Sequence, residues 1–244
     1  MVITSKSNPL IKTVSSLSDK KFRKQLNLYL VEGLKPVKEC IAAGCEVEKI
    51  ICTPEHETAF SDAVIVSESV FKSVSSEKTP QGVLAVVKLP QTELKPPEKS
   101  CLLLDCVQDP GNLGTVIRTA NAAGYNEIYL INCTDAYSPK AVRASMSGIF
   151  FVNVYSGSRE EILNALNGVP LICADMDGED IFSFSPPEKF CLCIGNEGGG
   201  ISEEVKSCAA HTVKIPMQST CESLNAAVSA GIAMYALKNN LKSK

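Results

Sequence analysis

The stretch "CLLLDCVQDPGNLGTVIRTANAAG", Cys101 to Gly124, joins an apolar run, a turn that contains glycine and an amphipathic segment. The apolar residues of the amphipathic segment have the i, i+3, i+4, i+7 spacing of one helix face: Leu113, Val116, Ile117 and Ala120. The stretch therefore predicts a strand, a tight turn and a helix that packs on a sheet. Nucleotide-binding loops begin in the same way, so the residues of the turn have to decide its function.

The glycines of this turn do not form a dinucleotide fingerprint. Gly111 and Gly114 are separated by two residues and no third glycine follows in register, and a G-K-[ST] sequence is absent as well. Asn112 is placed to cap the predicted helix, and Arg118 follows six residues later. A cation near a helix N-terminus is disfavoured by the helix dipole unless an anion joins it there. An ordinary surface arginine behind an asparagine cap is the alternative.

The rest of the C-terminal part repeats the alternation of apolar runs and helical patterns. Most of these runs lack polar alternation, which is typical of strands in a parallel sheet that is covered on both faces. The last helical pattern shows an apolar stripe of Leu224, Ala227, Val228 and Tyr235. The further predicted strands are "EIYLINC", "FFVNVY", "PLICADM", "FCLCIGN" and "HTVKIPM". We expect an α/β fold with a parallel sheet.

A second domain is expected before this sheet. The segment "LPQTELKPPEKS", Leu89 to Ser100, is rich in proline and charge and has no apolar period, as in a linker. Short apolar runs and helical patterns alternate upstream of it, which indicates a small α/β sheet. The predicted division is residues 1–90 for an N-terminal domain, 91–99 for a linker and 100–244 for the catalytic part.

Composition restricts the class of protein. A hydrophobic content of 45% with 21% charged residues is ordinary for a globular chain of 244 residues. No apolar run approaches the roughly 18 residues that span a bilayer, and the first residues lack a signal peptide's apolar segment. The 11 cysteines show no C-x-x-C pair, so we expect reduced thiols, no metal site and a cytoplasmic location.

The chain carries a net charge of −3, but one short segment concentrates positive charge. The cluster consists of Lys20, Lys21, Arg23 and Lys24. Such a group of cations is a candidate surface for RNA phosphates, although a merely solvated helix face has the same composition.

Two further loops carry unusual residues. In "CIGNEGGGIS", Cys193 to Ser202, an apolar strand runs into Glu197 between glycines, and consecutive glycines are costly to order unless backbone geometry or a ligand requires them. In "KIPMQSTCESLNAAVSAG", Lys214 to Gly231, a strand ends in a polar loop before the last helix. Ser223 could cap that helix, whereas Asn225 in the first turn has no propensity rationale.

Together and in this order, the three loops resemble the signature motifs of the SpoU (TrmH-type) family of RNA ribose methyltransferases, in the SPOUT superfamily. Outside the motifs, "LVEGLKPVKECI" and "TPQGVLAVV" are similar to the family's N-terminal substrate-binding domain. The start, "ITSKSNPLIKTVSSLSDKKFRKQ", resembles the 23S ribosomal RNA branch more than the transfer-RNA branch.

The resemblance assigns roles to residues of this chain. Its catalytic residues are Asn112, Arg118, Glu197, Ser223 and Asn225, and its cofactor contacts are Gly195, Ile215 and Leu224. The stretch "SPKAVRASMSG" adds Lys140 and Arg143 as RNA contacts. The resemblance also implies a deep C-terminal trefoil knot, S-adenosylmethionine as cofactor, and a homodimer.

The implied reaction moves a methyl group from a sulfonium to a ribose 2′-oxygen. The family proposal makes Arg118 the base, yet a guanidinium stays protonated at ordinary pH. We expect instead that Arg118 grips an RNA phosphate that accepts the proton, while Asn112 positions the hydroxyl.

Two other classes of function are compatible with parts of the sequence. A dinucleotide-dependent oxidoreductase would use the turn after Asp105, with Asp135 as its acidic residue, but the glycine register is missing. A catalytically silent RNA-binding protein predicts damage in the motifs, and the motif residues are intact.

Overall fold

The computed structural model describes residues 2–196 and 198–242. The chain forms two compact units, and each is described by itself. The N-terminal unit comprises Met1–Gln91 together with Asp135–Phe150, and the C-terminal unit comprises Thr92–Thr134 together with Phe151–Lys244. The segment Asp135–Phe150 thus packs with the N-terminal unit although it lies within the predicted catalytic part of the sequence.

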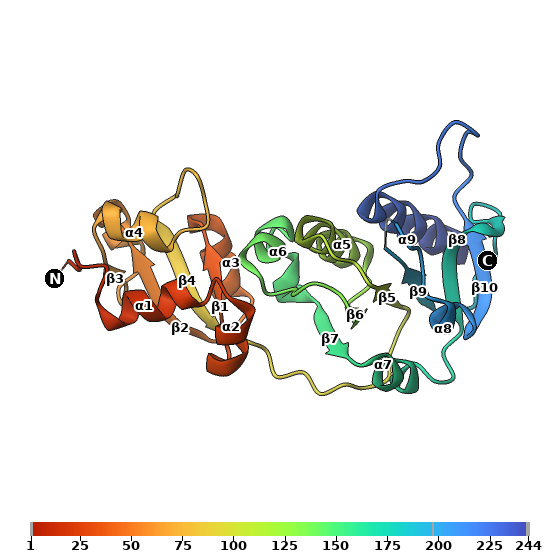
Figure 1. Ribbon diagram of the computed structural model, residues 1–244, viewed down its shortest axis with the longest axis horizontal. Coiled ribbons are helices and arrows are strands. Elements are labelled where there is room, and N and C mark those ends of the chain that lie inside the picture. Colours follow the sequence, from red (N-terminus) through yellow and green to blue (C-terminus); the bar gives the residue numbers. More distant parts are fainter. Residues whose placement is uncertain (1, 197, 243–244) are drawn as a thin grey trace. The chain divides into compact units, whose positions relative to one another are not determined.

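The N-terminal unit is a small mixed sheet with helices on both faces (Figure 1). Its strand order is β1-β4-β2-β3, in which β4 pairs antiparallel with β1 and β2 while β2 and β3 are parallel. The strands are β1 Leu28–Glu32, β2 Val47–Cys52, β3 Val64–Ile65 and β4 Val83–Lys88. The helices are α1 Pro9–Ser16, α2 Lys20–Leu26, α3 Leu34–Ala42, η1 Pro54–Ala59, α4 Glu68–Val74 and α6 Pro139–Ala144.

Alternation along β1 explains how this sheet is covered. Leu28 and Leu30 share a core with residues of α1 and α4, whereas α3 contacts β1 and β4. Because successive strand side chains point to opposite faces, one strand can supply both cores. The predicted small α/β domain is confirmed.

The C-terminal unit is built on a six-stranded sheet of order β10-β8-β9-β5-β6-β7, and all its pairings are parallel. Its strands are β5 Cys101–Asp105, β6 Glu127–Ile131, β7 Asn153–Gly157, β8 Leu171–Asp180, β9 Cys191–Ile194 and β10 Ala209–Lys214. Its helices are α5 Pro110–Ala123, α7 Arg159–Ala165, α8 Glu203–Lys206 and α9 Ala226–Lys242, and η2 Gly148–Phe151 spans the boundary between the units. The predicted parallel sheet is confirmed.

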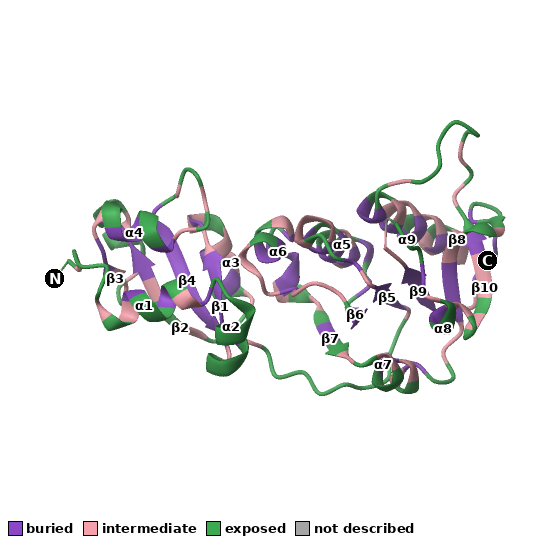
Figure 2. Cartoon of the chain, viewed as in Figure 1, coloured by how far each residue is buried: buried purple, intermediate pink, exposed green. Residues whose placement is uncertain are grey.

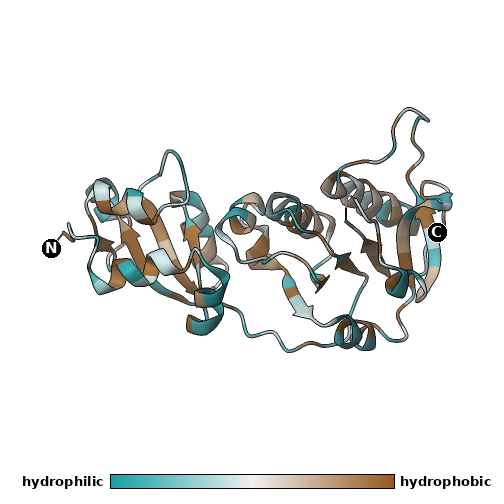
Figure 3. Ribbon diagram, viewed as in Figure 1, coloured by the Kyte–Doolittle hydropathy of each residue, from teal (hydrophilic) through white to brown (hydrophobic). Residues whose placement is uncertain are grey.

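The central strands β5 and β9 are buried throughout and apolar except for Asp105, which ends β5 (Figures 2 and 3). Helices α5 and α9 lie on one face, and α7 and α8 lie on the other (Figure 1). Cys101, Cys191 and Cys193 belong to the core on the α7 and α8 side. All 11 cysteines are free, as expected for thiols that act as small hydrophobic side chains.

The two helices on the first face follow the sequence pattern to different degrees. The predicted stripe of α5, Leu113, Val116, Ile117 and Ala120, is buried as expected. The predicted stripe of α9 is only partly right, because Ala227 is buried whereas Val228 and Tyr235 are about half exposed, at 50% and 49%. The residues that α9 buries are mostly small: Ala226, Ala227, Ala230, Ala233, Met234 and Leu237.

The segment predicted as a linker has no regular secondary structure, but much of it is hydrogen-bonded to the C-terminal unit. The Thr92 hydroxyl donates to the carbonyl of Val154 at 3.2 Å, and the Glu98 amide donates to the carboxylate of Glu127 at 2.8 Å. The buried Tyr129 donates its hydroxyl to the Lys95 carbonyl at 2.8 Å. These bonds hold residues 92–98 along the C-terminal unit.

Candidate functional site

A cavity of about 350 Å³ lies within the C-terminal unit, where the chain leaves strands β8, β9 and β10. The lining includes the three residues predicted to bind the cofactor, Gly195, Ile215 and Leu224, and also the predicted catalytic residue Ser223. The other lining residues are Ala174, Asp175, Met176, Ile194, Asn196, Gly199, Gly200, Lys206, Val213, Lys214, Met217, Glu222, Ala226 and Ser229. Carboxyl ends of parallel strands are the usual place for a ligand in such folds.

The glycine-rich loop on one wall is closed on itself. Asn196 and Gly200 exchange backbone hydrogen bonds of 3.0 and 2.9 Å, and the Asn196 side chain accepts from the Gly198 amide at 2.7 Å. A Cβ at Gly195 would lie 2.1 Å from the carbonyl carbon of Gly200, so no larger residue fits there. Gly200 itself has a φ of +64°. The glycines therefore serve the close approach of the loop's own backbone as well as exposing it to the cavity.

The end of strand β5 holds this loop from both sides. The side-chain Nδ2 of Asn196 donates to the Cys106 carbonyl at 2.8 Å. The carboxylate of Asp105 accepts from the Ser202 amide at 2.8 Å and from the Ser202 hydroxyl at 2.5 Å. Asn196 and Ser202 flank the glycines, so adjacent residues of β5 and its turn fix both ends of the loop. We call Asp105, Cys106, Asn196 and Ser202 the loop clamp.

Asp105 supports the glycine-rich loop, a role that was not predicted from the sequence. Its side chain is fully buried, and its nearest cation is Arg159, whose guanidinium lies 3.8 Å away. A buried carboxylate is costly unless hydrogen bonds and a counter-charge compensate it, and here both are present. The available signal was a carboxylate that ends an otherwise apolar strand, "CLLLD".

Helix α5 begins at Pro110, about one helical turn before the start that a cap at Asn112 would give. Its N-cap is Asp109, whose side chain accepts from the Asn112 amide at 2.9 Å. The predicted cap at Asn112 is wrong, because Pro110 occupies the first helical position and so places the cap before it. The side chain of Asn112 is thereby released from capping.

Asn112 instead pairs with Asn225. The Asn225 amide donates to Oδ1 of Asn112 at 3.0 Å, and Oδ1 of Asn225 accepts from the amides of Ala227 and Val228 at 3.0 and 3.3 Å. Asn225 therefore caps α9, and Ser223, which the sequence offered as the cap, lines the cavity instead. The capping role supplies the rationale that Asn225 lacked in the sequence.

Two predicted catalytic residues stand apart from this pair. Arg118 is exposed on α5 and has no hydrogen bond or ion pair to any residue that the structure describes. The predicted contact of Arg118 with an RNA phosphate stays a prediction. Glu197 lies outside the described residues.

The cavity carries charge of both signs. Asp175 and Lys206 form an ion pair of 2.7 Å on its wall. Burial raises the pKa of Asp175, but the hydrogen bond and charge of Lys206 outweigh it and lower the pKa overall. The same hydrogen bond raises the pKa of Lys206, so both groups stay charged at neutral pH.

These walls fit S-adenosylmethionine. Backbone at Gly195 and Ile215, together with Met176, Met217 and Leu224, offers polar edges and an apolar slot for an adenosyl group. The carboxylates of Asp175 and Glu222 suit a positively charged sulfonium or ammonium. Among residues 2–196 and 198–242, no cluster of His, Cys, Asp or Glu could hold a metal ion.

The predicted RNA contacts lie in the N-terminal unit. Lys20, Lys21 and Lys24 are exposed. Arg23 is 3% exposed, pairs with Asp135 at 2.7 Å, and donates to the carbonyls of Leu17 and Ser18 at 2.8 Å each. A guanidinium bonded in this way holds the unit together and is not presented to a phosphate.

The last two predicted RNA contacts are on or beside α6. Lys140 is exposed at the beginning of that helix. Arg143, in its last turn, is paired with Glu77 and donates to the Ser76 hydroxyl at 3.2 Å.

Within the described part of the chain, no helix is long and apolar enough to cross a membrane.

A parallel α/β sheet with a cavity of this chemistry at its strand ends, next to the Asn112–Asn225 pair, suits an S-adenosylmethionine-dependent methyltransferase. Residues 99–235 match the SpoU rRNA Methylase family, and residues 8–85 match the MRM3-like substrate binding domain. The chain belongs to the SpoU rRNA methylase family, as the three motifs predicted.

Similar proteins match the whole chain. The 23S rRNA (guanosine(2553)-2′-O)-methyltransferase RlmP of Bacillus subtilis (strain 168) is 33% identical, over 97% of this chain and 98% of its own. The 23S rRNA (uridine(2479)-2′-O)-methyltransferase of Streptomyces viridochromogenes is 27% identical, over 96% and 90%. The AdoMet-bound rRNA methyltransferase from Sinorhizobium meliloti superposes with a TM-score of 0.89 at 29% identity, over 99% and 98%.

Proposed function

We propose that this enzyme transfers the methyl group of S-adenosylmethionine to a ribose 2′-hydroxyl of 23S ribosomal RNA. The observation that carries the proposal is the hydrogen bond between Asn112 and Asn225. It joins the first motif to the third, and the chain neighbours of Asn225, Leu224 and Ala226, line the cavity that suits the cofactor. The 23S substrates of RlmP and of the Streptomyces enzyme support ribosomal RNA.

The cofactor, when bound, supplies an electrophilic methyl group on a sulfonium. The chain must then hold the acceptor oxygen in line, which alone can be worth on the order of 7 kcal/mol. The hydroxyl becomes a good nucleophile only as its proton leaves. Arg118 remains protonated and cannot accept that proton, so we assign the role of acceptor to an RNA phosphate oxygen that Arg118 grips.

The other motif residues orient these groups. The Asn112 side chain, held by Asn225, is proposed to position the 2′-hydroxyl. Ser223, exposed on the cavity wall, is proposed to contact the substrate nucleotide, and Glu197 to fix Arg118 or its loop. Gly195, Ile215 and Leu224 are proposed to hold the cofactor.

The N-terminal unit is proposed to bind the RNA outside the reacting nucleotide. Exposed lysines at Lys20, Lys21, Lys24 and Lys140, with Arg143, would supply the salt-dependent part of the affinity. The burial of Arg23 removes it from this set. The proposed functional division is residues 1–90 for RNA recognition, 91–99 for the connection and 100–244 for catalysis.

A homodimer and a trefoil knot complete the proposal. The half-exposed Val228 and Tyr235 leave an apolar stripe on α9, which suits a second copy of the chain. Loops after β9 and β10 line one cavity, and Asn225 reaches Asn112 beside it, as a chain threaded through a knot would. We place the enzyme in the cytoplasm, where ribosomal RNA and reduced thiols occur together.

The test is ribose-methylation mapping of total RNA from cells with and without this gene, complemented by the wild-type gene and by an Arg118→Ala variant. A 23S position that loses its methyl group and regains it only with the wild-type gene supports the proposal. A lost site in transfer RNA would assign the substrate to the other branch of the family. No lost site at all would favour a catalytically silent RNA-binding protein.

A further inference from the structure

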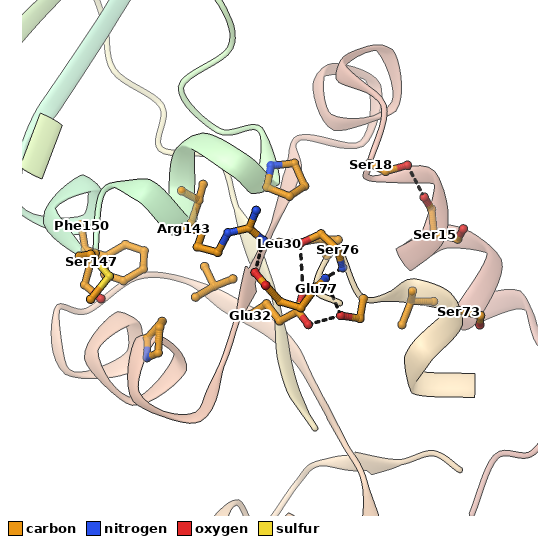
Figure 4. A pocket seen from close by; sticks show the side chains of 17 residues that line it. Ser15, Ser18, Leu30, Glu32, Ser73, Ser76, Glu77, Arg143, Ser147 and Phe150 are labelled. Carbon is orange, nitrogen blue, oxygen red and sulfur yellow. Dashed lines mark hydrogen bonds and ion pairs between the residues drawn. The ribbon is translucent and has the colours of Figure 1, made fainter. Parts of the chain in front are cut away.

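A second cavity, of about 290 Å³, lies within the N-terminal unit and shares no lining residue with the cofactor cavity. Strand β1 contributes Leu30 and Glu32, the turn after α4 contributes Ser76 and Glu77, and α6 contributes Arg143 (Figure 4). Its volume is at the lower end of the roughly 300–1,000 Å³ that is usual for small-molecule sites. It therefore suits a single base or nucleoside better than a larger ligand.

The acidic side of this cavity is rigid. Glu32 accepts hydrogen bonds from the Ser75 hydroxyl, from the Ser76 amide at 3.0 Å and from the Ser76 hydroxyl at 3.1 Å. The Glu77 amide donates to the Ser75 hydroxyl at 2.9 Å. Glu32 is thus satisfied by the turn it holds, and this turn presents the carboxylate of Glu77 to the cavity (Figure 4).

Glu77 and Arg143 form the one pair of groups here that a ligand can exchange. They are joined by an ion pair, and their side chains are 32% and 47% exposed. Ion pairs so open to solvent contribute little stability, so a better partner for either group can replace the other. A phosphate would suit Arg143, and a pair of N–H donors would suit Glu77.

The rest of the lining is mostly apolar and includes four serines, Ser15, Ser18, Ser73 and Ser147. A base is recognised out of a helix by stacking and apolar contact on its faces and by hydrogen bonds along its edge. The apolar lining residues are Leu30, Val31, Pro36, Val74, Pro139, Val142, Met146 and Phe150. A nucleotide has flat apolar faces, an edge with hydrogen-bond donors and a phosphate. The apolar residues of the cavity match the faces, the Glu77 carboxylate matches the donor edge and the Arg143 guanidinium matches the phosphate.

We propose that this cavity is a subsite for an unpaired guanine nucleotide of the RNA substrate, distinct from the nucleotide that is methylated. On binding, a phosphate replaces Glu77 on Arg143, and the released carboxylate accepts from N1–H and N2–H of guanine. Guanine is favoured because its pairing edge presents two adjacent donors, which a carboxylate can accept together. This inference rests on the proposed function, in which the substrate is RNA. The match of residues 8–85 to a substrate binding domain supports RNA binding by this unit.

The subsite can be tested with GMP as the probe. The full chain, labelled with ¹⁵N and saturated with S-adenosylhomocysteine to fill the cofactor cavity, is titrated with GMP, UMP or 1-methyl-GMP. We expect GMP to shift the amide signals of Ser76, Glu77 and Phe150, and to bind at least fivefold more tightly than UMP. The methyl group of 1-methyl-GMP removes the N1–H donor, so it should bind at least fivefold more weakly than GMP.

Two variants give opposite expectations. Glu77→Gln should weaken GMP at least fivefold but strengthen ribose 5-phosphate, because it releases Arg143 from its partner. Arg143→Ala should weaken both ligands. Glu46→Gln is the matched control, since Glu46 forms an exposed ion pair with Lys88 outside the cavity and should leave both affinities unchanged. Thermal unfolding of each variant establishes that it is folded.

Two outcomes overturn the subsite: equal affinity for GMP, UMP and 1-methyl-GMP, or shifts that avoid the cavity. Methylation of ribosomal RNA by the wild-type enzyme is measured in parallel. Methylation without GMP binding contradicts only the subsite, whereas GMP binding without methylation contradicts the proposed function.

Discussion

The side-chain amide of Asn225 donates a 3.0 Å hydrogen bond to Oδ1 of Asn112, and the same Asn225 caps helix α9. The first turns of α5 and α9 are therefore fixed to one another by a residue that stabilises its own helix at the same time. Separating these two roles by substitution is possible, because they use different atoms of one side chain.

Asn225→Asp should lower activity with little loss of stability. An aspartate keeps the oxygen that caps α9 but cannot donate to Asn112. Asn225→Ala removes both interactions and should also destabilise the enzyme by about 1 kcal/mol, the usual value of a cap. Urea unfolding and methyl transfer to ribosomal RNA are measured for both variants. Equal activity of Asn225→Asp and wild type would show that the Asn112 contact does not serve catalysis.

Arg118→Lys should reduce kcat by about 100-fold or more, because a lysine keeps the charge but loses the planar fork that binds a phosphate through two hydrogen bonds. Binding of S-adenosylmethionine should not change, since Arg118 does not line the cofactor cavity. Thr115→Ala, exposed on the same helix, is the control. Full activity of the lysine variant with normal RNA binding would exclude an arginine-centred mechanism.

Asp105→Asn should weaken cofactor binding through the loop clamp. The substitution removes the charge that strengthens both hydrogen bonds from Ser202 and leaves Arg159 without its buried partner. Hydrogen bonds to a charged group are worth about 1.5–3 kcal/mol each, so we expect at least a tenfold rise in Kd. Calorimetric titration with S-adenosylmethionine measures it. Ser202→Ala keeps the backbone hydrogen bond to Asp105, so its Kd for S-adenosylmethionine should lie between those of Asp105→Asn and the wild type.

Tyr235→Glu should convert the proposed dimer into a monomer. Tyr235 is half exposed in the single chain, so the fold of each copy should survive a charge that an apolar interface cannot accommodate. Light scattering after gel filtration measures the mass. Ile41→Glu, at a site of similar exposure on α3 in the N-terminal unit, is the control and should leave the mass unchanged. A wild-type monomer would contradict the homodimer itself.

The Asp175–Lys206 pair predicts a pH dependence of stability. The folded-state pKa of Asp175 is lowered, so its contribution is present above the unfolded-state value, about 3.9, and is lost as pH falls through the folded value. Lys206→Gln should therefore be less stable than wild type at pH 7, and the difference should shrink as the carboxylate is protonated. Urea unfolding from pH 7 to about pH 3 measures the difference. A constant difference over this range would show that the pair does not set the dependence.

Much of the fold followed from the sequence because its signals are local. Uninterrupted apolar runs identified the parallel strands, and the stripe of α5 identified the face that packs on the sheet. The stripe of α9 misled because Val228 and Tyr235 stay about half exposed in the single chain, and a sequence pattern does not distinguish a core residue from a half-exposed apolar residue.

The site was predictable where loops carry unusual residues, and less so where long-range contacts decide. Gly195, Ile215 and Leu224, which the family resemblance named as cofactor contacts, line one cavity. The burial of Arg23 depends on Asp135, more than a hundred residues later, and the role of Asp105 depends on Ser202. No local pattern contains either relationship.

The crowding at Gly195 has a consequence for engineering the cofactor. Because the backbone of Gly200 occupies the space that a side chain at Gly195 would need, this wall can neither be trimmed nor moved by substitution. Room for a bulkier alkyl sulfonium has to come from other lining residues, of which Met176, Met217 and Leu224 can each be shortened. An enzyme altered in this way would label its RNA with a chemical handle instead of a methyl group.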